Sequence, residues 1–183
     1  MNTEDETGFT GAKMALFLGQ RLVVILRDDL PGLPFAGQWD LPGGGREGQE
    51  TLFNCVQREC HEELGLTVLP ENVLWKRRFL QENTGDPVWF FVARLRSDAS
   101  ERIVFGDEGQ EWRMMEVAEF LRHPKGITAF QDRLRLYFEQ MGELPAKKSP
   151  RCLKRGKGDE HQEDRVRRGV SPVKSVAPTR PIT

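Results

Sequence analysis

Short apolar runs recur along the chain, separated by segments rich in glycine, proline and polar residues. Runs of strand length lie at residues 13–17, 21–26, 73–81, 88–95 and 111–115. Gly19 and Gln20 separate the first two runs, an arrangement typical of a β-hairpin. Residues 83–87 form a turn-like break between the third and fourth runs. The pattern therefore predicts a set of strands, of which the first two form a hairpin.

Three other segments have helical patterns. Residues 51–64 contain neither proline nor glycine, and Thr51 is suited to cap the start of a helix and Gly65 to end it. Residues 116–122 predict a short helix and residues 128–140 a longer one. One face of the longer helix carries Phe130, Leu134, Tyr137 and Phe138. Strands and helices in this mixed order predict an α/β fold with one hydrophobic core.

The composition changes at residue 145. Residues 145–183 hold five of the 11 prolines and no aromatic residue. Such a segment cannot bury enough apolar surface to offset the entropy lost on ordering. We therefore expect a flexible N-terminus over residues 1–11, a single domain over residues 12–144 and a disordered tail over residues 145–183.

The net charge of the whole chain, −1, hides two opposite contributions. Residues 1–144 carry 16 Lys and Arg against 24 Asp and Glu, a net charge of −8. Residues 145–183 carry 11 Lys and Arg against four Asp and Glu, a net charge of +7. The basic tail has the charge to attract nucleic acid, but such a run is more often only a solvated tail. We therefore do not expect nucleic acid as the main partner.

Sequence features of secreted and membrane proteins are missing. There is no apolar stretch of about 18 residues, and the acidic residues 1–6 do not resemble the basic start of a signal peptide. The three cysteines form no C-x-x-C pair, which argues against a disulfide framework or a cysteine zinc site. We expect a cytoplasmic protein, monomeric or homodimeric, without a membrane partner.

Three carboxylates on the helix predicted at residues 51–64 form the most informative cluster. Glu59, Glu62 and Glu63 have i, i+3, i+4 spacing, which stacks them within one helical turn. Like charges so placed repel one another, and a hard divalent cation such as Mg²⁺ or Mn²⁺ would compensate them. No His or Cys shares that arc, so zinc is disfavoured. Taken alone, the pattern also fits a solvated acidic helix face.

A run of three glycines, residues 43–45, lies shortly before this helix. Glycine backbone can bend sharply and approach a ligand closely, and its amides can bind phosphate oxygens. Carboxylates, a divalent metal and a glycine loop together indicate a phosphorylated substrate and metal-assisted attack at phosphorus.

Residues 44–66 resemble the Nudix box, G-x5-E-x7-R-E-U-x-E-E-x-G-U, in which U is a bulky apolar residue. The matching positions are Gly44, Glu50, Arg58, Glu59, Cys60, Glu62, Glu63, Gly65 and Leu66. Cys60 is the one departure, because a U position normally holds an aliphatic residue. A small buried thiol packs acceptably there, so we interpret Cys60 as a core residue. Residues 39–44 and 108–112 also resemble MutT-type proteins, so the resemblance covers roughly residues 12–140.

The resemblance implies a Nudix α/β/α sandwich with a mixed β-sheet and a Mg²⁺ or Mn²⁺ cofactor. It implies that Glu59, Glu62 and Glu63 ligate the metal and that Glu62 and Glu63 are catalytic. Arg58 would pair with Glu50 and orient the helix.

The resemblance also implies two contributions from outside the helix. The backbone of Gly44 would face the metal and substrate. A further carboxylate from a later loop would act as metal ligand or catalytic base. Glu108 is our candidate for it, because its Glu-Gly-Gln context resembles that loop; the alternatives are Glu111 and neither of the two.

For the substrate, the resemblance implies a nucleoside diphosphate linked to another moiety. By elimination of other subfamily marks, we expect a MutT-type (deoxy)nucleoside triphosphate pyrophosphohydrolase, with oxidised nucleotides as one substrate class. ADP-ribose or another nucleotide sugar is the alternative. RNA 5′-end processing and a non-catalytic nucleotide-binding module are alternatives of another class. Trp39 and Phe35 flank the glycine loop and are suited to stack on a base or to cap the core.

Overall fold

The computed structural model describes residue 6 and residues 8–142; the tail predicted to be disordered therefore lies outside the described residues. Its sheet has the strand order β3-β2-β1-β6-β5, with β4 paired to β1 and β7 paired to β2. The strands are β1 (Gly11–Leu18), β2 (Arg21–Leu26), β3 (Trp39–Asp40), β4 (Gly43–Gly45), β5 (Val73–Leu80), β6 (Pro87–Leu95) and β7 (Glu111–Met115). The helices are α1 (Leu52–Leu64), α2 (Val117–Phe120) and α3 (Thr128–Met141), with 3-10 turns η2 (Pro70–Asn72) and η3 (Ser97–Arg102).

The sheet is mixed, as predicted. Strands β1 and β2 form the expected antiparallel hairpin across Gly19, whose φ is +63°. Strands β1 and β6 run parallel from the Gly11–Val88 pair to the Leu18–Leu95 pair. Since these two strands are far apart in the sequence, the crossover between them carries α1 and β5.

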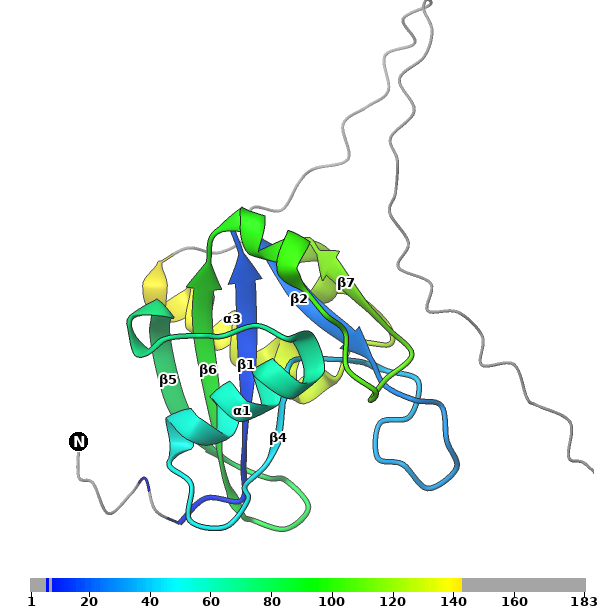
Figure 1. Ribbon diagram of the computed structural model, residues 1–183. Helices are drawn as coiled ribbons and strands as arrows, with labels where there is room; N and C mark the ends of the chain where they lie inside the picture. Colours follow the sequence, from blue (N-terminus) through cyan, green and yellow to red (C-terminus); the bar gives the residue numbers. More distant parts are fainter. Residues whose placement is uncertain (1–5, 7, 143–183) are drawn as a thin grey trace, which may run out of the picture. The chain divides into compact units, whose positions relative to one another are not determined.

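Helix α1 covers one face of the sheet and α3 the other (Figure 1). Side chains of β1 alternate between the two layers: Met14 and Leu16 pack with α1, whereas Ala15 and Phe17 pack with α3. The predicted α/β/α sandwich is therefore confirmed. Each layer has its own apolar core, and the α3 layer is rich in aromatic rings.

Helix α1 has the predicted limits. The Thr51 hydroxyl accepts a hydrogen bond from the Asn54 amide at 3.2 Å, and Gly65 ends the helix with a φ of +66°. Its core-facing residues are Leu52, Cys55, Val56, Cys60 and Leu64. Cys60 is fully buried, which confirms it as a core residue. Its burial raises the pKa of the thiol and makes it a poor nucleophile.

Several local features differ from the sequence prediction. Helix α2 is shorter than the predicted residues 116–122. The two 3-10 turns and the short strand β4 were not predicted, because no hydrophobic period marks them. Phe9 is buried and the Thr10 amide donates to the Pro87 carbonyl at 2.9 Å. Ordered contacts therefore begin before residue 12, the expected start of the domain.

Strand β1 has β6 along the whole of one edge, whereas two strands share its other edge. Strand β2 pairs with the end of β1, and β4 pairs with its start. Between them the Met14 amide donates to the Pro42 carbonyl at 2.8 Å. We call this division of the edge the fork and define it by Lys13, Met14 and residues 40–44. Within the described residues, no helix is both long and apolar enough to cross a lipid bilayer.

Candidate active site

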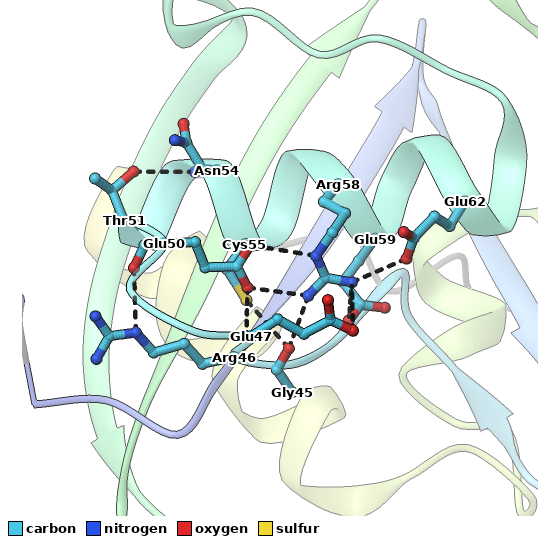
Figure 2. A network of polar contacts seen from close by, with 10 residues as sticks. All are labelled: Gly45, Arg46, Glu47, Glu50, Thr51, Asn54, Cys55, Arg58, Glu59 and Glu62. Atoms are coloured by element: carbon cyan, nitrogen blue, oxygen red, sulfur yellow. Dashed lines mark hydrogen bonds and ion pairs between the residues drawn. The ribbon is translucent and has the colours of Figure 1, made fainter.

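Arg58 lies at the centre of a network that joins helix α1 to the preceding loop (Figure 2). Its guanidinium binds both carboxylate oxygens of Glu50, at 3.0 and 3.2 Å. It also donates to Glu59 Oε1 at 3.0 Å, to Glu62 Oε2 at 2.9 Å and to the Gly45 carbonyl at 2.9 Å. One cation therefore offsets the charges of Glu50, Glu59 and Glu62, whose mutual repulsion would otherwise weaken the contact between the loop and the helix.

The charges in this network reinforce one another. Hydrogen bonds from Arg58 lower the pKa of Glu50 to about 2, and Glu50 in turn raises the pKa of Arg58. The Glu50 carboxylate also accepts the Glu47 amide at 2.8 Å. The loop is thus held on the helix by an ion pair that persists across the physiological pH range.

Arg58→Ala is expected to lower the free energy of unfolding by about 2 kcal/mol, because Glu50 would lose its cation and the box carboxylates would repel. Arg58→Lys should recover only part of the loss, since an ammonium group cannot form the two parallel hydrogen bonds by which a planar guanidinium binds Glu50. Urea unfolding with chelator present would measure both. Arg102→Ala, at an exposed residue of η3, is the matched control. Equal losses in the Arg58 and Arg102 variants would contradict the prediction.

The glycine loop meets two of the box carboxylates directly. A Cβ on Gly44 would lie 2.6 Å from Glu59 Oε1, so a larger residue there would displace that carboxylate from the loop. The Gly43 amide donates to Glu63 Oε2 at 2.8 Å. Gly43 itself has a φ of +126°, and a Cβ there would lie 2.3 Å from the Ala12 carbonyl oxygen. The glycines are therefore required for both chain path and close approach.

Burial shapes the electrostatics of the same two carboxylates. Burial raises the pKa of Glu63 to about 8, although Lys13 and the Gly43 amide oppose this. Burial also raises the pKa of Glu59, against the effect of Arg58. For both carboxylates, burial therefore outweighs the positive charges nearby, Arg58 and Lys13 for Glu59 and Lys13 for Glu63.

The donor chemistry of the site suits a hard divalent cation. The carboxylates of Glu59 and Glu63 both lie against the glycine loop, and carboxylate oxygens are the donors that such cations prefer. Glu62 is turned toward Arg58 in Figure 2, and no three His, Cys, Asp or Glu side chains of the described part of the chain form a preassembled metal cluster. The residues fit Mg²⁺ or Mn²⁺ if Glu62 exchanges Arg58 for the ion.

The segment that contains Glu108 is fixed beside α1. The Val104 amide donates to the Leu64 carbonyl at 3.0 Å, and the Gly106 amide donates to the Glu63 carbonyl at 2.9 Å. Gly106 is tightly packed, since a Cβ there would lie 2.3 Å from the Glu62 carbonyl oxygen. Glu108 follows two residues later, next to the end of the helix that carries the box.

The two candidate carboxylates after the box differ in their surroundings. Glu108 is exposed and has no hydrogen-bond or ion-pair partner among residues 6 and 8–142. Glu111 is bound to Arg113 at 2.6 Å, and the Arg113 guanidinium lies 4.8 Å from the ring centroid of Trp39. Trp39 belongs to the α3 layer. The carboxylate of Glu111 is therefore engaged on the opposite face of the sheet from α1, whereas that of Glu108 is unpaired within the described residues.

The two aromatic residues near the loop also differ. Trp39 is only 3% exposed, with Arg113 over its ring and His123 packed edge-on at 6.1 Å. Its faces are occupied by protein, so a base could not stack on it in this arrangement. Phe35 is 51% exposed, with a φ of +58°. Of the two, Phe35 is the accessible ring.

A buried charge cluster at the fork was not predicted from the sequence. Asp40 is 3% exposed, and its Oδ2 accepts from Lys13 Nζ at 2.9 Å and Arg27 Nη1 at 2.8 Å. Its Oδ1 accepts from the Leu41 amide at 2.6 Å. Lys13 also lowers the pKa values of Glu59 and Glu63. The sequence did contain one signal of this cluster: Lys13 begins the apolar run at residues 13–17. A charge that is buried there requires a partner of opposite charge.

The comparisons agree with this geometry. A sequence model described as the NUDIX domain matches residues 6–137. Among solved structures, a MutT protein from Methanosarcina mazei Go1 is 22% identical, with a TM-score of 0.58 over 76% of this chain and 99% of its own. A C. elegans Ap4A hydrolase in a binary complex is 16% identical, with a TM-score of 0.57 over 73% and 99%.

A bifunctional NMN adenylyltransferase/ADP ribose pyrophosphatase from Francisella tularensis, complexed with AMP and a Mn ion, is 15% identical. Its TM-score is 0.50 over 75% of this chain and 42% of its own. No curated protein sequence matches the chain. At these identities the structural neighbours establish the fold, and the family match over most of the chain establishes the family. The chain therefore belongs to the Nudix family, and with every box carboxylate present it is a pyrophosphohydrolase.

Proposed function

We propose that this enzyme hydrolyses a diphosphate linkage in a nucleoside diphosphate joined to another moiety, with Mg²⁺ or Mn²⁺ held by Glu59, Glu62, Glu63 and Glu108. The observation that carries the proposal is the contact of the box carboxylates with the glycine loop, where Glu59 lies against Gly44. The metal would neutralise the diphosphate and acidify a bound water.

The chain's own residues prepare the site for this chemistry. Arg58 fixes the helix on the loop and holds Glu62 at 2.9 Å, which keeps that carboxylate beside the site until it exchanges Arg58 for the ion. The Gly43 amide fixes Glu63 Oε2. Glu108 has no partner in the described residues and lies in a segment anchored to the end of α1, which supports our assignment of it as the base for the attacking water. Gly44 and Phe35 would contact the nucleotide, whereas the buried Trp39 would pack in the core beside the glycine loop.

Within this reaction class we propose a (deoxy)nucleoside triphosphate as the substrate, released as a monophosphate and pyrophosphate. The neighbours include a MutT protein and two proteins whose names give different substrates, an Ap4A hydrolase and a bifunctional NMN adenylyltransferase/ADP ribose pyrophosphatase. A screen of the purified enzyme against nucleoside triphosphates, their oxidised forms, dinucleotide polyphosphates and ADP-ribose would test the proposal. A higher kcat/KM for ADP-ribose would replace it, and binding without turnover would indicate a non-catalytic module.

Chelation is expected to lower the rate of hydrolysis by about a hundredfold or more, because the diphosphate would be polarised by the cation that the box carboxylates hold, not by the carboxylates themselves. Excess Mg²⁺ or Mn²⁺ should restore the rate. A thermal melt in chelator is the control, since a cooperative transition there would show that the fold survives. Full hydrolysis in chelator would contradict the metal assignment.

A further inference from the structure

Arg133 of helix α3 is a half-buried cation that contacts no acidic residue in the described part of the chain. Its guanidinium carbon lies 4.7 Å from the ring centroid of Phe79 and 5.4 Å from that of Phe130. Burial lowers the pKa of Arg133, and Glu82 acts on it only through longer-range attraction, because no carboxylate of the described residues is within ion-pair distance of Arg133. Two aromatic faces replace only part of the hydration that the cation has lost.

A second cation approaches the same ring. Arg77 on strand β5 is exposed, and its guanidinium carbon lies 5.8 Å from the centroid of Phe79. It too lacks an ion-pair partner in the described part of the chain. Two guanidinium groups around one phenyl ring repel each other, and a shared anion would reverse that effect. A guanidinium that lies over an aromatic ring can still bind oxygen atoms through the N–H groups in its own plane.

The sheet register connects these cations with the fork. Lys13 on β1 is paired with Phe90 on β6, and Phe90 is paired with Arg77 on β5. Their side chains lie on the α3 face, since Phe90 belongs to the α3 core layer. Lys13 Nζ also lies 5.9 Å from the centroid of Phe130, the ring that Arg133 contacts. Arg77 and Arg133 therefore lie on the α3 face of the sheet, between the fork and the edge formed by β5.

We propose that Arg77 and Arg133, around Phe79, bind a phosphate group that the substrate carries in addition to the diphosphate it loses. Within the proposed substrate class, the preferred members are then nucleotides with a further phosphate monoester, such as one on the sugar. A planar guanidinium binds phosphate through two parallel hydrogen bonds, and the aromatic contacts keep the side chain in place for it. The position of the cleaved diphosphate at the fork rests on the proposed function.

Binding of matched monophosphate and bisphosphate nucleotides tests the site without any hydrolysis. Titration calorimetry of the full chain with Mg²⁺ should give about tenfold tighter binding of 2′,5′-ADP or 3′,5′-ADP than of 5′-AMP. Arg133→Gln and Arg77→Gln should each remove most of this preference, whereas Arg133→Lys keeps the charge and should recover part of it. Arg102→Gln is the control, because η3 contacts Gly19, at the opposite end of β1 from Lys13.

Equal affinity for 5′-AMP and the bisphosphates, or a preference that survives in both Gln variants, would overturn the proposal. Tighter binding of the dinucleotide pApA than of 3′,5′-ADP would also overturn it, because the site would then read a phosphodiester of a nucleic acid. Arg77 is exposed, so Arg77→Gln remains informative if Arg133→Gln fails to fold. Hydrolysis without the bisphosphate preference refutes this inference alone, and the preference without hydrolysis refutes the proposed reaction alone.

Discussion

Replacing Glu63 by Gln is expected to lower kcat by about three orders of magnitude while the fold remains intact. The side chain lies against the Gly43 amide, and Gln can still present an oxygen there. What the variant loses is the negative charge that a divalent cation requires. Steady-state hydrolysis with saturating Mg²⁺ would measure the effect. Turnover equal to that of the unaltered enzyme would refute the assignment of Glu63 to the metal site.

The same variant should be more stable than the natural chain when metal is removed. Burial raises the pKa of Glu63 to about 8, above its ordinary value of 4.5. The folded state therefore favours the protonated carboxyl, and this contribution is full below about pH 4.5 and is lost as the pH rises through about 8. Glu63→Gln does not ionise, so at pH 9 in chelator it should be more stable by about 2 kcal/mol.

Urea unfolding at pH 4.5 and pH 9 would separate this effect from a general change in packing. The gain should be present at pH 9 and absent at pH 4.5. Glu62→Gln is the matched control, because the Glu62 side chain is 56% exposed and contacts Arg58. That variant should also lose turnover without gaining stability at pH 9. A pH-independent change in Glu63→Gln would contradict the electrostatic explanation.

Asp40→Ala is expected to cost about 3–5 kcal/mol of unfolding free energy, the largest loss of stability that we predict for a single substitution in this chain. Asp40 is the shared acceptor for Lys13 and Arg27, and its other oxygen binds the Leu41 amide. Removing the carboxylate leaves two partly buried cations without an anion and a buried amide without an acceptor. Urea unfolding at neutral pH would measure the loss.

Asp98→Ala provides the comparison for a surface pair, since Asp98 binds Arg96 at 3.5 Å and both side chains are exposed. Its cost should be within about 1 kcal/mol. Asp40→Asn keeps the shape of the side chain but not its charge, so it should fall between the two. If Asp40→Ala were no more costly than Asp98→Ala, the fork would be held by packing rather than by this carboxylate.

The sequence predicted most of the elements because their signals are local. Thr51 and Gly65 mark the ends of α1, and the apolar face that contains Phe130 and Leu134 predicts α3. The parallel pairing of β1 with β6 has no local signal, since it depends on the crossover that brings Gly11 beside Val88. Strand β4 consists only of glycine, so no hydrophobic period could indicate it.

The candidate site was predictable where the motif itself specifies spacing. The i, i+3, i+4 arrangement of Glu59, Glu62 and Glu63 follows from helical geometry alone. The burial of Trp39 and the pairing of Lys13 with Asp40 depend on contacts between segments that the motif does not cover. Resemblance to a family could not supply them, because they are formed by this chain's own tertiary packing.

The anchoring of the segment after η3 limits how its length can vary. The amide of Gly106 is bonded to the end of α1, and the amide of Gln110 is bonded to the Leu26 carbonyl at 2.8 Å. Only residues 107–109 lie between these two hydrogen bonds, so Glu108 is in a short loop that is held at both ends. One inserted residue would lengthen the loop by up to about 3.5 Å, a distance comparable to the length of a glutamate side chain. We therefore expect loop length, more than loop composition, to decide whether Glu108 reaches the box.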